Sequence, residues 1–139
     1  FVVLLFLAAW GNDTLAYCTG MLIGKHKMSP ILSPKKSIEG LVGGIVGAAI
    51  LGALYGLYLN TYIRFSFNPV TMFPIVCGLG GAVSVIGDLA ASAIKRDSGI
   101  KDYGTLIPGH GGILDRFDSI IFIAPVIYYL TVMISGGAI

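Results

Sequence analysis

Charged residues are scarce in this chain. Only 12% of its 139 residues are charged and 55% are hydrophobic, whereas a soluble domain usually carries about twice that share of charge. We therefore do not expect a soluble globular fold. The net charge of +2 at pH 7 is also too small to indicate a nucleic-acid partner, and we expect none.

Cysteine and targeting signals are also scarce. Cys18 and Cys77 both fall inside apolar stretches, so we interpret them as small packing residues, ahead of a disulfide or a metal pair. The sequence starts at Phe1 without an initiating methionine, and its first apolar run has no basic n-region or small-residue cleavage site, so it is unlike a signal peptide. We expect that an amino-terminal part is missing from this sequence.

Four long hydrophobic segments are present instead, at residues 1–23, 41–59, 70–94 and 119–139. At about 1.5 Å per helical residue, each approaches the roughly 30 Å of a bilayer core. The sequence therefore predicts an all-α, polytopic integral membrane protein with a bundle of about four transmembrane helices.

Small residues recur four apart in the second segment. Gly43 is followed by Gly47, and Ala48 is followed by Gly52 and Gly56. In lipid this spacing lets helices approach closely, so we interpret these residues as helix-packing positions.

The basic residues gather in two predicted loops, 24–40 and 95–118. Each loop holds four of the nine, and Arg64 is the ninth. Because two helices separate the loops, they share one side of the membrane, and the positive-inside rule places that side in the cytoplasm. A cytoplasmic phosphate substrate would meet both loops.

The loop at 95–118 combines glycine with lysine, aspartate and one histidine. Around His110, the residues Pro108, Gly109, Gly111 and Gly112 form a permissive backbone. Such a backbone suits a close approach of main-chain amides to an anion. We interpret His110 as a donor to a phosphate oxygen.

Asp115 and Asp118 lie three residues apart at the predicted start of the last helix, and so on one helical face. Each could simply cap free amides and complement the helix dipole. Because they flank Arg116 beside a glycine-rich loop, a divalent-cation site is the better interpretation. Carboxylate, phosphate and water oxygens are what Mg²⁺ prefers.

Asp88 lies near the loop end of the third segment, on one helical stripe with Ser84, Ser92 and Lys95. It could pair with Lys95 or accept hydrogen bonds from serines. A carboxylate near lipid is costly unless it is compensated, and the stripe leads into the loop that holds Asp115. We therefore expect Asp88 to face the bundle interior and to share a metal site with Asp115.

Two further polar pairs are candidates. Asn12 and Asp13 interrupt an apolar segment, which indicates either a functional site at membrane depth or a break in the helix. Lys35 and Lys36 could be a solvated loop. Serines flank the two lysines, and a helix is predicted to start near Glu39. This arrangement favours contact with a phosphate.

These residues together resemble the signature of the bacterial phosphatidate cytidylyltransferase family. Eleven identities over 27 positions fall at the signature's spacing. They are Ser92, Lys95, Arg96, Lys101, Asp102, His110, Gly111, Gly112, Asp115, Arg116 and Asp118. Two upstream stretches, around Asn12–Asp13 and from Gly24 to Gly40, are also similar to family segments.

The resemblance implies that the chain transfers the cytidylyl group of CTP to phosphatidic acid, making CDP-diacylglycerol and pyrophosphate. It implies that residues 1–139 are the C-terminal catalytic membrane domain of a longer chain in a bacterial inner membrane, with the active site facing the cytoplasm. Mg²⁺ is the implied cofactor, while a second cation and a homo-oligomer stay open.

The implied site divides into two groups of residues. The catalytic group is Asp88, Asp115, Asp118, His110, Lys95 and Arg96, and its three aspartates are the metal ligands. The substrate-binding group is Asn12, Asp13, Ser33, Lys35, Lys36, Ser92, Lys101, Asp102, Gly111, Gly112 and Arg116.

Two alternatives remain at this point. Another CTP-using membrane enzyme, of the polyprenol kinase or CDP-archaeol synthase type, would share much of this chemistry. A cation transporter would explain acids inside hydrophobic segments, but it would not need a loop of lysine, histidine, glycine and aspartate in a fixed pattern.

Overall fold

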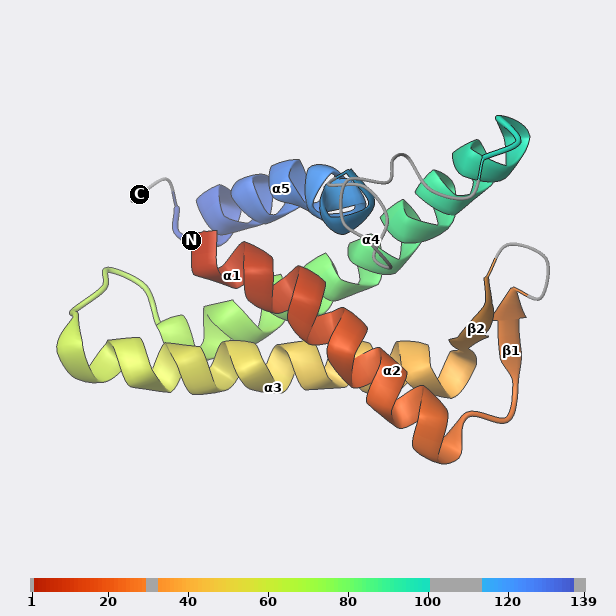
Figure 1. The fold of residues 1–139 in the computed structure, drawn as a ribbon. Coiled ribbons are helices and arrows are strands. Elements are labelled where there is room, and N and C mark those ends of the chain that lie inside the picture. The colour runs from red at the N-terminus through yellow and green to blue at the C-terminus, as the bar shows by residue number, and fades with distance from the viewer. Residues whose placement is uncertain (1, 30–32, 101–113, 137–139) are drawn as a thin grey trace.

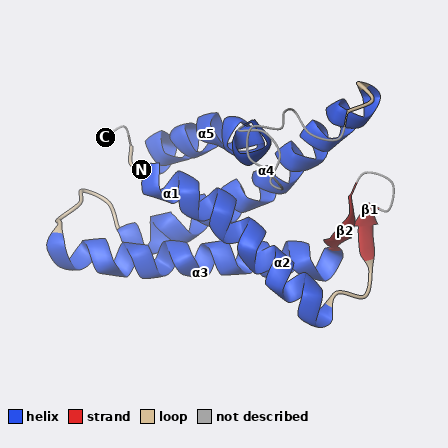
Figure 2. Cartoon of the chain, in the orientation of Figure 1, coloured by secondary structure: helices blue, strands red, loops and turns tan. Residues whose placement is uncertain are grey.

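The computed structural model describes residues 2–29, 33–100 and 114–136 of the chain, and these are mainly helical (Figures 1 and 2). Three helices are long and apolar enough to cross a membrane, namely Val2–Ile23, Ile38–Tyr62 and Pro69–Asp97. The expected all-α membrane bundle is confirmed. The fourth expected span is shorter in the described part of the chain, where its apolar portion is Ser119–Ile134.

The first membrane helix changes its winding near the middle. It consists of α1 (Val2–Phe6), a π-helical turn η1 (Leu7–Gly11) and α2 (Asn12–Ile23). The polar pair that begins at Asn12 therefore does not break the helix. It follows directly on a π-helical turn, a feature that is rare in helices and frequent at functional sites.

A β-hairpin connects α2 to the next helix. Its strands are β1 (Lys27–Ser29) and β2 (Ser33–Ser37), which pair antiparallel with Lys27 opposite Ser37. The following helix α3 (Ile38–Tyr62) starts where the Ser37 side chain accepts a hydrogen bond from the Gly40 amide at 3.1 Å. The prediction of a plain loop over 24–40 was therefore incomplete.

The helix α4 (Pro69–Asp97) is the centre of the bundle. In its most apolar stretch 56% of the residues are buried, against 28% for α3 and 22% for the first helix. It packs along α3 on one side and against the fourth helix, α5 (Leu114–Ile134), on another. The core side chains come from α1, η1, α3, α4 and α5, and include Leu4, Ala8, Ala48, Met72, Phe73, Val76, Ile123 and Ile127.

Glycines allow α3 to lie directly against α4. A Cβ atom on Gly52 would come within 2.6 Å of the Phe73 carbonyl oxygen, and Gly56 makes a similarly close approach further along. Gly43 and Gly47 approach α2 on another side of α3. The packing role predicted for these small residues is confirmed.

The two cysteines differ. Cys77 is buried, with its sulfur 3.8 Å from the carbonyl oxygen of Leu4, so it packs as expected. Cys18 is exposed, and the prediction that it packs inside the bundle was wrong. Both are free thiols.

The close contact between α3 and α4 can be tested with Gly52→Ala. The added methyl group would clash with the backbone of α4, which cannot change rotamer as a side chain can. We therefore expect a loss of about 1–3 kcal/mol in the free energy of unfolding. Thermal or denaturant unfolding in detergent measures the loss.

Gly78→Ala is the matched control. Its Cβ would find Ala49 Cβ at 3.5 Å, an ordinary contact, and alanine has up to about 1 kcal/mol better helix propensity than glycine. Equal stability of the two variants would contradict the packing described here.

Candidate functional site

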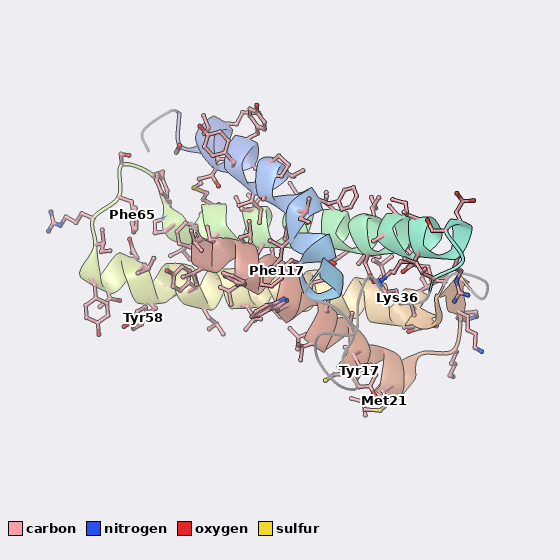
Figure 3. The ribbon with its side chains drawn as sticks, turned by 45° about the horizontal axis from the view of Figure 1, so that its top comes forward. Tyr17, Met21, Lys36, Tyr58, Phe65 and Phe117 are labelled. Carbon is pink, nitrogen blue, oxygen red and sulfur yellow. The ribbon has the colours of Figure 1, made fainter. Side chains whose placement is uncertain are left out.

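Asp88 on α4 forms an ion pair with Lys36 on β2. The ammonium nitrogen of Lys36 contacts the Oδ2 atom of Asp88, and the side chains of Lys36 and Asp88 are 26% and 28% exposed. The nitrogen atom itself is shielded from solvent. Figure 3 shows Lys36 between α4 and the start of α3, so the pair ties the hairpin to the central helix.

This pairing brings together two residues that the sequence placed in different roles. Asp88 was predicted as a metal ligand, and Lys36 as a phosphate contact. Helical spacing offers Lys95 as the partner of Asp88, yet the lysine bound to its carboxylate comes from the other predicted loop. The largely shielded position of Asp88 agrees with the expected orientation toward the bundle.

Asn12 is fully buried where three helices meet. A Cβ atom on Gly44 of α3 would lie 2.7 Å from Asn12 Oδ1, and one on Gly81 of α4 would lie 3.0 Å from it. Only glycine at both positions leaves room for this amide. Asn12 therefore places a polar side chain inside the bundle, while its predicted role in a functional site stays a prediction.

Two oxygen atoms near this junction have no hydrogen-bond partner in the described part of the chain. They are Asn12 Oδ1 and the hydroxyl of Ser84, whose side chain is also fully buried. An unmade hydrogen bond at a buried polar group costs about 1–3 kcal/mol. Gly81, Ser84 and Asp88 follow one another along α4 at helical spacing, so a polar path leads from Asn12 toward Asp88.

Asp13 differs from its neighbour because its position is exposed. The Nδ2 atom of Asn12 lies 3.5 Å from Asp13 Oδ1, at the limit of a hydrogen bond. The predicted polar pair thus divides, with the amide inside the bundle and the carboxylate at its surface.

Ser92, Lys95 and Arg96 continue α4 beyond Asp88. Ser92 is half-buried one turn further on, Lys95 is half-buried, and Arg96 is exposed in the last turn. Positive side chains in the last turn of a helix also interact favourably with the helix dipole. The three residues lie at the end of α4 that carries Asp88.

A contact between His26 and Glu39 closes the base of the hairpin. The Nδ1 atom of His26 lies 2.6 Å from Glu39 Oε1, and the His26 amide donates to Oε2 at 3.2 Å. The Ile38 amide donates to the His26 carbonyl at 2.9 Å. This arrangement fixes the strand that carries Lys36 at the start of α3.

Sequence reasoning missed the pairing of His26 with Glu39. The available signal was an acidic residue in a first helical turn near a histidine-containing loop, which is too general to indicate a partner. The hairpin that brings the two together was itself not predicted.

The remaining predicted residues are described less fully. Lys101, Asp102, His110, Gly111 and Gly112 lie outside the described residues. For the others, the structure describes the backbone of β2 or α5 and not the side chain. These are Ser33, Lys35, Asp115, Arg116 and Asp118.

The predicted metal site stays a prediction, because the side chains of Asp115 and Asp118 are outside the described part of the structure. Among the side chains that the structure does describe, no three histidine, cysteine, aspartate or glutamate side chains form a metal-binding group. Asp88 nevertheless fits a Mg²⁺ ligand in chemistry, because it presents a carboxylate, the kind of oxygen donor that Mg²⁺ prefers. Mg²⁺ usually takes one or two carboxylates and completes its shell with phosphate and water oxygens.

The arrangement places one negative and one positive side chain next to each other. Such a pair suits a substrate that arrives as a metal-bound polyphosphate.

Comparison with known proteins gives one family. The family model described as "Cytidylyltransferase family" matches residues 1–134. The match therefore covers all the helices and strands of the structure.

Curated relatives agree with this match. The chain is 39% identical over 134 residues to the phosphatidate cytidylyltransferase of Staphylococcus saprophyticus, which covers 96% of this chain and 50% of the relative. It is 40% identical over 132 residues to that of Staphylococcus aureus strain COL, covering 95% and 49%. The chain thus spans about half the length of the curated relatives it matches.

Proposed function

Because the chain belongs to the cytidylyltransferase family, we propose that it carries the catalytic membrane domain of a phosphatidate cytidylyltransferase. In this reaction a phosphate oxygen of phosphatidic acid attacks the α-phosphorus of CTP. Pyrophosphate leaves, and CDP-diacylglycerol stays in the membrane. The names of the relatives support this choice of substrates.

The structural observation that supports the proposal is the contact between Lys36 and Asp88. It puts a candidate phosphate-binding cation and a candidate metal-binding carboxylate at one point on the central helix. A cation transporter, the alternative function, would need the Asp88 carboxylate but not Lys36.

Charge neutralisation is the main demand of this reaction. The phosphate of phosphatidic acid has a second pKa near 6, so it is largely a dianion at neutral pH and needs no strong base. Together with a triphosphate it brings roughly five to six negative charges into one site. The proposed aspartate ligands would hold Mg²⁺, which would supply positive charge against the phosphates.

We assign the remaining neutralisation to basic side chains on both sides of Asp88. Lys35 and Lys36 would face the phosphates from the hairpin, and Lys95, Arg96, Lys101 and Arg116 from the end of α4 and beyond. His110, between glycines, would donate to a phosphate oxygen. Asp115 and Asp118 would complete the carboxylate set with Asp88.

The buried end of the site would recognise the rest of the substrate. Asn12 offers a side-chain oxygen without a partner inside the described bundle, and Asp13 lies next to it at the surface. We assign both to substrate binding, together with Ser33, Ser92, Asp102 and the backbone at Gly111 and Gly112.

We further propose that this site faces the cytoplasm of a bacterial inner membrane. CTP is made in the cytoplasm, and eight of the nine basic residues belong to 24–40 and 95–118. The contact of Lys36 with Asp88 supports placing the hairpin and the end of α4 on the same side.

The proposed activity is tested with radiolabelled CTP and the full-length protein in detergent. Phosphatidic acid should become labelled as CDP-diacylglycerol. Asp115→Asn and Asp118→Asn should each lower turnover by at least about 100-fold, because they remove metal-binding charge and little core volume.

Asp97→Asn, at an exposed position at the end of α4, is the matched control and should keep normal turnover. Label that enters a polyprenol or an archaeal ether lipid in place of phosphatidic acid would refute the proposed substrate. Near-normal turnover of both aspartate variants would indicate that Asp115 and Asp118 only cap the helix.

The orientation is tested by cysteine labelling in intact cells, in a Cys18→Ser background that removes the exposed native thiol. A cysteine placed at Ser66 should react with an impermeant external reagent, and one placed at Ser98 should not. Both positions are exposed, so reactivity reports the side of the membrane. The opposite pattern would reverse the proposed topology.

A further inference from the structure

The ion pair between Lys36 and Asp88 raises a question about the order of binding. The ammonium group already contacts one oxygen of the carboxylate to which a metal ion would bind. A divalent cation on this carboxylate would lie close to a positive charge in a partly shielded place, where like charges repel each other. The lysine and the cation would therefore compete for this carboxylate.

We propose that Lys36 is a resident counter-ion of Asp88 that leaves the carboxylate when a divalent cation binds there. The lysine and the cation then compete for one side chain. The displaced ammonium group becomes free to meet the phosphate oxygens that arrive with the cation. The last step rests on the proposed function, whereas the competition itself does not.

The hairpin is built so that the side chain can move while its backbone stays in place. Lys36 lies on β2, between Ser33 and Ser37, which pair with Ser29 and Lys27 of β1. The contact of His26 with Glu39 lies just beyond Ser37, so the backbone is held on both sides of Lys36. The four-carbon stem of lysine has several rotatable bonds, so the exchange needs only a change of rotamer.

The exchange also explains why the site tolerates a carboxylate when no metal is bound. Asp88 lies on the most buried helix of the bundle, where an uncompensated charge would be costly. Lys36 supplies the compensating charge in the structure described here. A metal ion would supply it after the exchange.

Binding of Mn²⁺, measured by electron paramagnetic resonance without nucleotide, tests the competition directly. Lys36→Met keeps the length of the side chain and removes its charge. Because the competitor is gone, we expect Mn²⁺ to bind this variant about tenfold more tightly than the wild type. Lys36→Arg, which keeps a cation near Asp88, should bind as weakly as the wild type.

Two controls separate competition from general effects of charge. Lys27→Met removes an exposed positive charge from the same hairpin and should leave Mn²⁺ affinity unchanged. Adding Asp88→Asn to Lys36→Met should abolish the gain, because the gain depends on that carboxylate. Where Lys36→Met fails to fold, Lys36→Gln carries the same test.

A purely structural salt bridge predicts a different result. Its loss would lower thermal stability in detergent and leave Mn²⁺ affinity unchanged or weaker, which would overturn the inference. A gain that persists without Asp88 would overturn it as well. The two proposals can fail separately. Turnover of CTP without tighter Mn²⁺ binding by Lys36→Met would refute only the exchange of Lys36 for the cation. Tighter Mn²⁺ binding without turnover of CTP would refute only the proposed function.

Discussion

The structure depends on how one carboxylate is compensated. Asp88 lies on α4, the most buried of the membrane helices, and a charge in such a place needs a partner. Lys36 supplies that partner from a hairpin outside the helices. The hairpin is in turn held at its base by Glu39 and His26. These contacts together therefore fix the position of Lys36.

The glycine contacts between α3 and α4 serve the same end. Because α3 lies against α4 through Gly52 and Gly56, the start of α3 is brought close to the end of α4 that carries Asp88. The hairpin precedes α3 directly, so this packing delivers Lys36 to the carboxylate. A bulkier residue in the seam would disturb the site as well as the fold.

Asn12 extends the polar region into the bundle. Its side chain occupies the space left by Gly44 and Gly81, on the path that leads along α4 to Asp88. This amide oxygen has no hydrogen-bond partner among the residues that the structure describes, which is difficult to explain by packing alone. The proposed role of Asn12 in substrate binding would account for it.

Much of this could be predicted from the sequence, and the parts that could not share one cause. Hydropathy indicated the helices, and small residues four apart indicated their packing, because both are local patterns. The hairpin was not predicted, since the sequence Ser33–Ser37 lacks alternation of polar and apolar residues. The sequence predicted Asp88 as a metal ligand, with Lys95 or serines as alternative partners, because only the fold shows that Lys36 lies beside it.

Asp88 is proposed to hold a metal ion together with Asp115. A crystal structure with bound Mn²⁺, recorded at a wavelength where Mn²⁺ scatters anomalously, tests this most directly. We expect an anomalous peak at coordination distance from both carboxylates, with the Lys36 side chain turned away from Asp88. Carboxylates more than about 8 Å apart, too far for ligands at about 2.0 to 2.1 Å from a single Mg²⁺-like ion, or a peak elsewhere with Lys36 still on Asp88, would contradict it.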